Sequence, residues 1–358
     1  MKILQLLPTL AYGDAIGNHT IALRTVIESM GYETGIYAEN IGLLANSKIA
    51  MDIGELPDLK KDDIILYHLS TGSRLNHEIT KLPGHKIIIY HNITPPEYFQ
   101  GYDLFVARNI RWALEDAKYL ADKADYCLTD SDFNKNDLVS LGYQCPIDVM
   151  PILIPFSDYE QKPSAKIIKR YNDQCTNIIF TGRIAPNKKQ EDIIAAFYYY
   201  KKYCDSKARL FLVGSCGQGN LYYEKLKQYV ENLELDNVYF TDHIKFDEIL
   251  AYYQIADIFL CMSEHEGFCV PLVESMFFKV PIIAYNSTAV PFTLGGSGVL
   301  VDDKDPLVIA KLIDKVVKDE ALRQSIIDGQ TSRLNDFTYE NIRKQFVKYL
   351  EKYIGEQG

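Results

Sequence analysis

Short apolar runs alternate with helical patterns along the chain, and this alternation restricts the folds that the chain can adopt. In the first half, apolar runs cover residues 3–7, 33–38, 64–69 and 86–90, and a helical pattern over residues 17–30 follows the first of them. Strands that alternate with helices favour a parallel, doubly wound sheet. Ligands of such sheets bind beyond the carboxyl ends of the strands. The sequence therefore predicts an α/β fold with its sites at strand ends.

The chain has 358 residues, which is long enough for two domains that each bury a core. Between about residues 151 and 176 the strand pattern weakens while prolines and charged residues accumulate, as in an interdomain linker. The alternation restarts at Asn177. We therefore predict a first Rossmann-like domain over residues 1–155 and a second over residues 156–338.

Composition excludes several classes of protein. A content of 47% hydrophobic and 24% charged residues is that of a globular protein, and the formal net charge of −10 argues against a nucleic-acid partner. The seven cysteines are scattered without a CxxC spacing, so we expect reduced core residues in a cytoplasmic protein, with no zinc or redox role. Residues 1–8 resemble a first strand rather than a signal peptide. No run approaches the ~18 apolar residues of a membrane span.

The stretch of residues 263–275 combines a strand end, a tight turn and a helix start. It follows the apolar run of residues 256–261, and Pro271 fits an early helical position. Backbone N–H groups at such a helix start favour an anion, which Gly267 allows to come close. The carboxylates of Glu266 and Glu274 are better suited to accept hydrogen bonds from hydroxyl groups. A ligand with phosphates flanked by hydroxyls is a nucleotide sugar.

Cationic side chains follow the first strand of the second half. Arg183 and Lys188 or Lys189 lie between the apolar run of residues 177–180 and a helical pattern that begins at Gln190. A guanidinium can grip two phosphate oxygens, while an ammonium acts as a point charge. The spacing therefore predicts a diphosphate pocket, for which Lys188 is our choice over Lys189.

These motifs resemble those of a known enzyme family. The pattern Glu-Gly-Phe-x-x-Pro-x-x-Glu from Glu266 to Glu274, with seven residues between the two glutamates, closely resembles the signature of the retaining glycosyltransferases of family 4. The segment from Gly182 to Lys188 resembles the family's Gly-Arg-x-x-x-x-Lys motif, and the likeness is strongest over residues 177–306. The resemblance implies the GT-B fold, with two Rossmann-like, doubly wound parallel-sheet domains facing across a cleft. It also implies that a final helix, residues 339–358, packs back on the first domain.

The resemblance implies four catalytic residues. Arg183 and Lys188 would neutralise charge on the leaving diphosphate, and Glu266 would hold the transferred sugar. His91 follows the run of residues 86–90 and, by resemblance, faces the donor sugar. Taken alone, a histidine at a strand end is more often hydrogen-bonded locally. The enzyme would be a retaining, metal-independent hexosyltransferase.

The donor would be bound by glycines at strand ends and by residues of the glutamate motif. In the loop of residues 12–18 the family's adjacent glycine pair is missing, so either Gly13 or Gly17 makes the close approach to the diphosphate. Glu274 would hold the ribose hydroxyls. The expected donor-binding residues are Gly13, Gly17, Gly182, Gly214, Gly267, Phe268, Cys269, Val270 and Glu274.

No metal or cofactor is expected, and the nucleotide sugar is a substrate. Asp130, Ser131 and Asp132 have the Asp-x-Asp form of a metal motif, but they follow an apolar run, so we predict that Ser131 or Asp132 caps a helix. The donor base remains open among uracil, guanine and adenine.

The acceptor is the least defined partner. By resemblance it is a saccharide or a lipid-linked glycan of surface polysaccharide synthesis, used at the inner face of the membrane. Two alternatives remain: a GT-B nucleotide-sugar epimerase and a non-catalytic nucleotide-sugar-binding protein. A cluster of aromatic and basic residues follows His91 and consists of Tyr98, Phe99, Tyr102, Phe105, Arg108, Arg111 and Trp112. Aromatic residues at helical spacing are more often part of a hydrophobic core, which favours a core role for them over a peripheral membrane contact.

Overall fold

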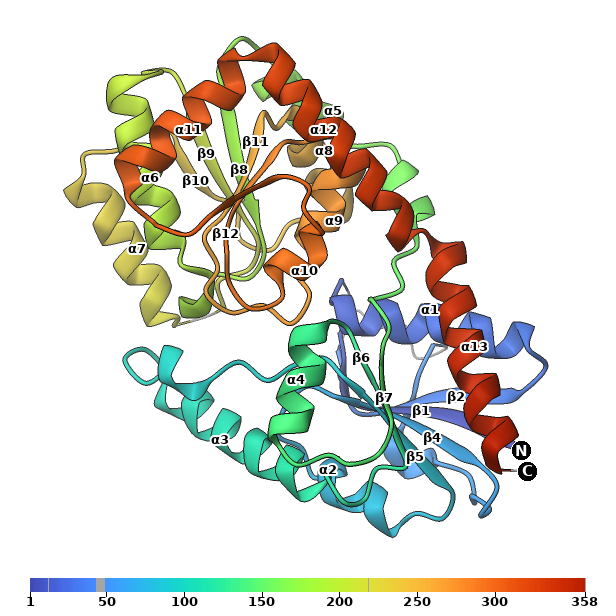
Figure 1. The fold of residues 1–358 in the computed structure, drawn as a ribbon. Helices are drawn as coiled ribbons and strands as arrows, with labels where there is room; N and C mark the ends of the chain where they lie inside the picture. Colours follow the sequence, from blue (N-terminus) through green and yellow to red (C-terminus); the bar gives the residue numbers. More distant parts are fainter. Residues whose placement is uncertain (12, 43–48, 218, 358) are drawn as a thin grey trace. The chain divides into compact units, whose positions relative to one another are not determined.

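The computed structural model describes residues 1–11, 13–42, 49–217 and 219–357. The chain divides into two compact units (Figure 1). Unit 1 comprises Met1–Glu97, Phe105–Phe156 and Asp336–Gly358, and unit 2 comprises Tyr98–Leu104 and Ser157–Asn335. The main change of unit thus falls after residue 156, where we expected it after 155, and the return falls after 335, where we expected it after 338. The short segment of unit 2 within the first half was not anticipated.

In unit 1, the described residues form a sheet of seven parallel strands in the order β3-β2-β1-β4-β5-β6-β7. The doubly wound α/β architecture predicted from the sequence is therefore confirmed. The strands are β1 (Lys2–Leu10), β2 (Glu33–Ile41), β3 (Met51–Asp52), β4 (Ile64–Leu69), β5 (His85–Tyr90), β6 (Tyr126–Thr129) and β7 (Ile147–Val149).

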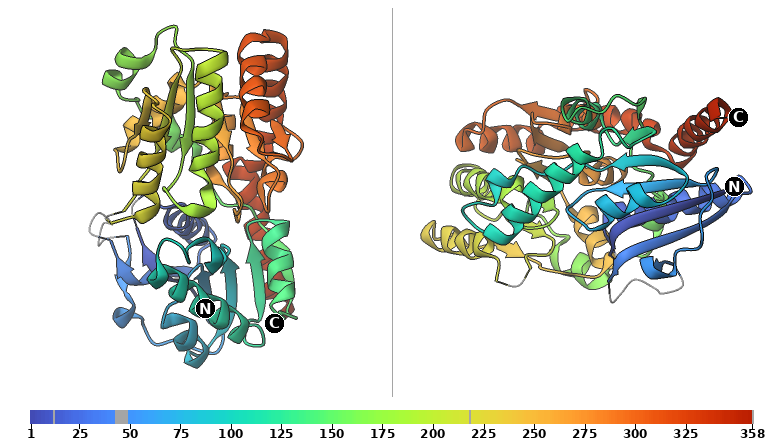
Figure 2. Two further views of the ribbon diagram at one scale, coloured as in Figure 1. Left: turned by 90° about the vertical axis from the view of Figure 1, so that its left-hand side faces the viewer. Right: turned by 90° about the horizontal axis from the view of Figure 1, so that it is seen from below.

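Helices cover both faces of this sheet (Figure 2). On one face, apolar residues of α1 and α13 share a core with β1 and β4, and this core includes Phe346 of α13. On the other face, α2, α3 and α4 pack on the strands through residues such as Leu75, Ala113 and Leu138. The helices of unit 1 are α1 (Ala15–Ser29), α2 (Leu75–Glu78), α3 (Leu104–Tyr119), α4 (Asp132–Ser140) and α13 (Tyr339–Gln357).

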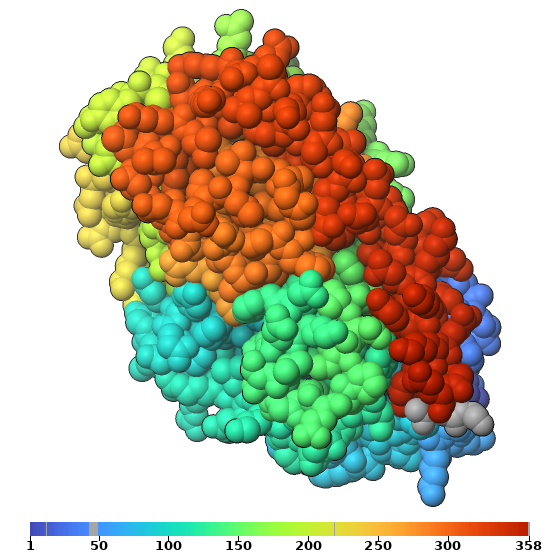
Figure 3. Space-filling view, viewed as in Figure 1, coloured from blue at the N-terminus to red at the C-terminus, as the bar shows by residue number. Residues whose placement is uncertain are grey.

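Unit 2 repeats the plan with six parallel strands among its described residues, in the order β10-β9-β8-β11-β12-β13. In the space-filling view, α11 and α12 make up much of its orange-red surface (Figure 3). The strands are β8 (Asn177–Thr181), β9 (Arg209–Val213), β10 (Val238–Phe240), β11 (Ile258–Cys261), β12 (Ile282–Tyr285) and β13 (Val299–Val301). The helices are α5 (Ala165–Tyr171), α6 (Gln190–Tyr203), α7 (Leu221–Asn232), α8 (Phe246–Ile255), α9 (Val270–Phe277), α10 (Val290–Leu294), α11 (Pro306–Lys318) and α12 (Glu320–Leu334).

The strand order reverses once in each sheet, between β1 and β4 and between β8 and β11. At such a switch point the loops after the two central strands leave toward opposite faces, which opens a crevice at the carboxyl ends of the strands. The loops that carry the predicted cations and glutamates follow β8 and β11. Each unit therefore presents its candidate residues where an open parallel sheet binds ligands.

The change of unit falls within residues 151–176, where Ile152, Leu153 and Ile154 are buried and α5 follows. One expectation about local structure needs correction. The helix-spaced aromatics of α3 are not all core, because Phe105 is 81% exposed and Trp112 is 59% exposed. Within the described part of the chain, no helix combines the length and apolar character needed to cross a membrane.

Candidate functional site

The ends of β8 and β9 come so close that glycine is required. Gly214 has a φ of +147°, and a Cβ atom there would lie 2.2 Å from the carbonyl oxygen of Gly182. The Gly182 N–H donates to the Val213 carbonyl oxygen at 2.9 Å, which holds the two strand ends together. The absence of side chains at both positions leaves backbone exposed to a ligand above β8.

Lys188 and Glu266 form an ion pair at the switch point of unit 2. Lys188 ends a short 3₁₀ helix, Pro186–Lys188, that follows β8, and its Nζ lies 2.6 Å from Oε2 of Glu266 in the loop after β11. Asn187 ties the two loops together, because its side chain donates to the His265 carbonyl at 3.0 Å and its own carbonyl accepts from the Glu264 N–H at 2.9 Å. The Glu266 N–H donates to Thr288 Oγ1 at 2.9 Å. The pair is therefore fixed by the backbone on both sides.

The neighbouring cations have other arrangements. Lys189 turns to Glu264 and Glu191, with Nζ–O distances of 3.4 and 3.6 Å. Arg183 is exposed, and its guanidinium makes no ion pair with the described residues. Arg183 and Lys188 are close enough for the positive charge of Arg183 to lower the pKa of Lys188. The structure thus brings the predicted cations together and separates Lys188 from Lys189.

Electrostatics keep Lys188 charged in a largely buried position. Burial is the largest single effect and lowers the pKa of Lys188, but the charge of Glu266, its hydrogen bond to Lys188 and the nearby Cys269 together raise the pKa above its ordinary value. Burial lowers the pKa of the adjacent His265 to about 4, and the charge of Lys188 adds to that effect. At pH 7 Lys188 is therefore an ammonium and His265 a neutral imidazole.

Glu274 lies on α9 and is held by two tyrosines that the sequence did not single out. Tyr159 donates to Oε1 at 3.0 Å, and Tyr253 donates to Oε2 at 2.6 Å. Burial raises the pKa of Glu274, while the two hydrogen bonds act in the opposite direction. Each carboxylate oxygen has two acceptor sites, so both retain one for a ligand hydroxyl.

The turn between the two glutamates leads into α9. Cys269 precedes the helix with a φ of 73°, a left-handed conformation that is unusual for a residue other than glycine. Thr293 donates to the Phe268 carbonyl oxygen, and Phe268 is buried. The predicted donor-binding residues Gly267, Phe268, Cys269 and Val270 thus form one anchored turn at the start of α9.

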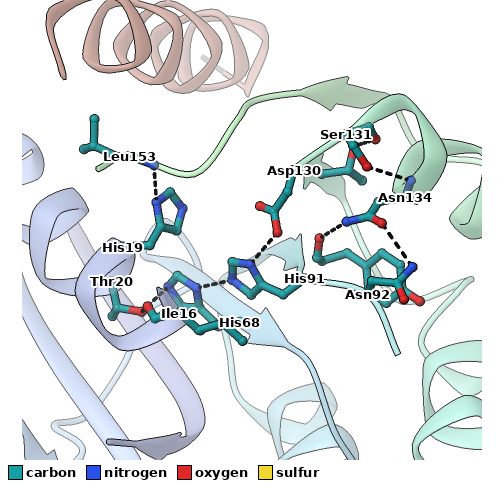
Figure 4. Close-up of polar contacts among 12 residues, drawn as sticks. Ile16, His19, Thr20, His68, His91, Asn92, Asp130, Ser131, Asn134 and Leu153 are labelled. Atoms are coloured by element: carbon teal, nitrogen blue, oxygen red, sulfur yellow. Dashed lines mark hydrogen bonds and ion pairs between the residues drawn. The ribbon is translucent and has the colours of Figure 1, made fainter. Parts of the chain in front are cut away.

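In unit 1, His91 lies in a buried polar network (Figure 4). Its Nδ1 is 2.8 Å from Oδ2 of Asp130, and its Nε2 is 2.9 Å from Nδ1 of His68. The side chains of His91 and Asp130 are 1% and 2% exposed. His19 lies edge-on to both other imidazoles, and its Nδ1 accepts from the Leu153 N–H at 2.8 Å.

The hydrogen bonds restrict where the protons of this network lie. Gln5 donates through Nε2 to the Thr20 carbonyl, so its Oε1, 3.1 Å from His68 Nε2, must accept from that nitrogen. His68 Nδ1 then accepts from His91, which leaves the second proton between His91 and Asp130. Burial and the nearby His91 lower the pKa of His68 and of His19 well below the usual value, so both are neutral. The two contacts of its ring nitrogens therefore fix the orientation of His91 between Asp130 and His68.

Gly13 and Gly17 have different structural roles. A Cβ atom on Gly17 would lie 2.9 Å from the Ala11 carbonyl oxygen, so Gly17 allows α1 to pack on the end of β1. Gly13 has a φ of +74° and no atom within 4 Å of its Cβ position. Only Gly13 leaves open space. Residue 12 of the same loop lies outside the described residues.

Several contacts of the predicted residues were missed from the sequence. Asp130 belongs to the segment with the Asp-x-Asp form of a metal motif, yet it pairs with His91. Ser131 caps α4, as predicted, by accepting a hydrogen bond from the Asn134 N–H at 3.2 Å. His68, His91 and Asp130 lie at or just after the ends of β4, β5 and β6, which are neighbours in the sheet. The available signal was therefore a polar residue at each strand end, which becomes informative only with the strand order.

Comparisons with known proteins agree with this geometry. Residues 162–333 match the family model "Glycosyl transferases group 1". The chain is 24% identical over 282 residues to "O-antigen chain mannosyltransferase B" of Escherichia coli, a match that covers 76% of this chain and 70% of that protein. It is 27% identical over 201 residues to "Capsular polysaccharide biosynthesis glycosyltransferase CapM" of Staphylococcus aureus, a match that covers 54% of this chain and 50% of that protein.

A solved structure shares the fold over nearly the whole chain. The Anabaena protein Alr3699/HepE in complex with UDP-glucose has a TM-score of 0.76 at 19% identity, with 98% of this chain and 100% of that chain covered. The fold predicted from the resemblance is thus confirmed, and the comparisons support a glycosyltransferase. The chain has the GT-B fold, and its residues 162–333 match the glycosyl transferases of group 1.

Proposed function

We propose that this protein is a retaining, metal-independent glycosyltransferase of family 4, which moves a hexose from a nucleotide-diphosphate donor to a saccharide or lipid-linked acceptor. The observation that carries the proposal is the Lys188–Glu266 ion pair beside Arg183 at the switch point of unit 2. This arrangement offers positive charge to a diphosphate and a carboxylate to hydroxyl groups. A nucleotide sugar is a ligand that uses both.

Charge stabilisation of the leaving diphosphate is the main catalytic task in this proposal. When the glycosidic C–O bond to the diphosphate breaks, negative charge grows on the oxygen that leaves. Arg183 and Lys188 neutralise that charge, together with N–H groups of the turn that precedes α9. Such preorganised groups often supply the largest catalytic effect, with a single donor worth about 3 kcal/mol.

Hydroxyl recognition falls to the two glutamates. Glu266 holds the transferred sugar through its carboxylate, which exchanges its contact with Lys188 for sugar hydroxyls. Glu274 holds the ribose, because Tyr159 and Tyr253 orient its carboxylate while leaving acceptor capacity. In this assignment the tyrosines are positioning residues.

His91 contributes a ring that is held in a fixed orientation. Its two ring nitrogens already contact Asp130 and His68 and its side chain is 1% exposed, so His91 meets the sugar through its backbone. Because both ring nitrogens are engaged, His91 does not transfer a proton in this proposal and instead stabilises the reacting face of the sugar. Gly13, with open space at its Cβ position, is our choice for the close backbone approach to the diphosphate.

The acceptor is proposed to be carried by a lipid at the cytoplasmic face of a membrane. The outer side of α3 exposes Phe105, Trp112, Arg108 and Arg111, which combine apolar rings with positive charge. Such a face suits the boundary of an anionic bilayer. The names of two relatives place them in O-antigen and capsular polysaccharide synthesis, which supports a surface-glycan role here.

A thermal-shift assay tests the proposal. Wild-type protein is heated with UDP, GDP or ADP and their sugar conjugates, with and without EDTA. A ligand that binds only the folded form at 100 times its Kd adds about 2.7 kcal/mol of stability. We expect one nucleotide to raise the melting temperature regardless of EDTA, and Glu274→Ala to abolish the shift while Glu231→Ala, an exposed change on α7, keeps it.

Two results would count against the proposal. If no nucleotide raises the melting temperature of the wild type, the donor site is wrong. If EDTA removes the shift, metal independence is wrong. Once an acceptor is found, the anomeric configuration of the product, followed by NMR, tests retention and separates transfer from epimerisation or binding without turnover.

A further inference from the structure

Two thiols and one carboxylate meet beneath the turn that carries the glutamate motif. Cys261 is the last residue of β11, Glu266 lies in the following loop, and Cys269 directly precedes α9. One ligand atom from each lies within 4.8 Å of the other two. Cys261 is fully buried, and Glu266 and Cys269 are each 7% exposed. No other set of three His, Cys, Asp or Glu side chains in the described part of the chain meets this criterion.

We propose that Cys261, Cys269 and Glu266 form an inhibitory Zn²⁺ site. Thiolate and carboxylate ligands are typical of protein zinc, with Zn–S distances of about 2.3 Å and Zn–O distances of about 2.0–2.2 Å. Around a tetrahedral zinc ion with these bond lengths, ligand atoms lie roughly 3.6–3.8 Å apart. The ligand atoms of the cluster all lie within 4.8 Å of one another, so the cluster needs to contract by at most about 1.2 Å, and the fourth position is left for water.

The charges at this site also suit a dication. Binding releases one proton from each thiol to solvent and forms two Zn–S bonds and one Zn–O bond. Lys188 stays beside the site through Oε2 of Glu266, which leaves the other carboxylate oxygen for the metal. The dication, two thiolates, one carboxylate and one ammonium then carry no net charge. Burial of the complete set is consequently far cheaper than burial of any one charge.

Cysteine spacing alone did not predict this site. The two cysteines are separated by seven residues, which is not a usual zinc spacing, and only the turn between β11 and α9 brings them together. A second thiol pair, Cys127 and Cys145 with Sγ atoms 3.5 Å apart, lies in unit 1 but joins no three-ligand cluster among the described residues. It is therefore a matched control.

Inhibition rests on the proposed function of Glu266. A carboxylate that ligates zinc cannot also hold the transferred sugar, so zinc and donor exclude one another. Because coupling between two ligands is reciprocal, the nucleotide sugar must weaken zinc binding by the same factor by which zinc weakens donor binding. Zinc here is an inhibitor and not a cofactor, which is consistent with a metal-independent reaction.

The site can be tested on the full-length, reduced protein without measuring activity. Apo protein in a phosphine reductant is titrated with Zn²⁺ against a chromophoric chelator, and separately with Co²⁺, whose absorption reports sulfur ligation. We expect Cys261→Ser to weaken zinc binding by at least about 10-fold, the lower end of the losses caused by changes even in outer-shell groups. Cys127→Ser should bind zinc as the wild type does. Zinc should also protect Cys261 and Cys269 of the wild type from alkylation, as read by peptide mass spectrometry, which requires no variant to fold.

The outcomes separate this inference from the proposed function. The zinc site would be overturned if the wild type and Cys261→Ser bound zinc with equal affinity. It would also be overturned if the wild type showed neither sulfur-to-cobalt absorption nor protection of the two thiols from alkylation. Oxidation of the two thiols to a disulfide without zinc uptake would do the same. Tight zinc binding that no nucleotide sugar weakens would leave the zinc site standing and count against the donor role of Glu266.

Discussion

Neighbouring lysines after β8 show how one residue position decides a role. Lys188 pairs with Glu266 at 2.6 Å, whereas Lys189 has a left-handed backbone and turns to Glu264. The Gly-Arg-x-x-x-x-Lys spacing predicted the first of the two, and the structure explains the difference through the turn that Lys189 makes before α6.

Lys188→Ala should therefore reduce the rate of sugar transfer much more than Lys189→Ala. Loss of one group that stabilises the leaving diphosphate costs about 10²–10³ in kcat. Lys189→Ala, which removes only partly exposed ion pairs, is expected to change kcat by less than about fivefold. Steady-state kinetics of both variants, with melting temperatures to check folding, measure this. Equal losses in the two variants would contradict the assignment of Lys188.

Glu274 combines a functional role with a cost in stability. Its pKa in the folded protein lies above its ordinary value of 4.5 because it is buried. Folded Glu274 thus holds a proton that the unfolded chain has lost, so its contribution to stability falls as the pH rises from about 4.5 through the folded pKa. Above the pKa of Glu274 in the folded protein, this loss of stability is complete.

Glu274→Gln cannot ionise and should gain stability relative to the wild type as the pH rises from 4 to 7. Each unit by which the pKa is raised corresponds to about 1.4 kcal/mol. The same variant should bind nucleotide more weakly, since it loses a charged acceptor for ribose. Denaturant unfolding at both pH values and the thermal-shift assay measure the two effects. A stability difference that does not change with pH would show that Glu274 titrates normally.

Among the elements, α3 differs most from its sequence prediction. Helix-spaced aromatics favoured core, yet Phe105 and Trp112 point to solvent, and the guanidinium of Arg108 lies 5.8 Å from the centre of the Trp112 ring. The core of this face is made by smaller residues of the same helix, Ala107, Ala113 and Ala117. Periodicity predicted that the helix has two faces but not which of them is buried, since alanines allow closer packing on the sheet.

The exposed face of α3 should bind vesicles that contain anionic lipid. Trp112 is the only tryptophan of the chain, so a blue shift of its fluorescence reports directly on this helix. Burial of a Phe side chain is worth about 1.5–3 kcal/mol, so Phe105→Asp should weaken vesicle binding by at least about 10-fold. Tyr203→Asp, at an aromatic residue of unit 2 that is 62% exposed, should leave binding unchanged. If wild-type fluorescence does not respond to vesicles, the membrane contact is wrong.

Most elements were predicted from the sequence, and their arrangement was not. Periodicity located β4 at residues 64–69 as observed, and it placed α1 within two residues of Ala15–Ser29. The order of the strands depends on contacts between distant segments, which no local pattern records. For that reason the candidate loops were predicted one by one, but the contact of Lys188 with Glu266 and the partners of His91 and Glu274 were not.

At the scale of the whole molecule, the two units should respond differently to acid. Unit 1 buries His19 and His68, whose pKa values in the folded state lie well below the reference value of 6.5. The unfolded chain takes up these protons and the folded chain does not, so stability is lost as the pH falls below about 6.5. In unit 2, His265 acts in the same direction, but Glu274 acts in the opposite one.

We therefore expect unit 1 to open before unit 2 on acidification. Each histidine contributes at most about 1.4 kcal/mol per pH unit. Hydrogen exchange followed by mass spectrometry between pH 7 and 5, corrected for the intrinsic pH dependence of exchange, compares peptides of β1 and β4 with those of β8 and β11. His68→Asn should make the response of unit 1 shallower, whereas His77→Asn, at an exposed position on α2, should not. Parallel loss of protection in both units would contradict the expectation.

The Lys188–Glu266 ion pair also favours ligands that satisfy both of its charged groups at once. With no ligand bound, each group neutralises the other, so the protein supplies its own counterions. A phosphate that binds Lys188 alone would leave the buried carboxylate of Glu266 without its partner. A neutral sugar that binds Glu266 alone would leave the buried ammonium of Lys188 without its partner. Both outcomes are costly, because an unpaired buried charge is strongly destabilising. Only a molecule that brings an anion and hydroxyl groups in one piece satisfies both sides at once. Selectivity for such two-part ligands against abundant cellular phosphate would then be present before any contact with a base or an acceptor is made.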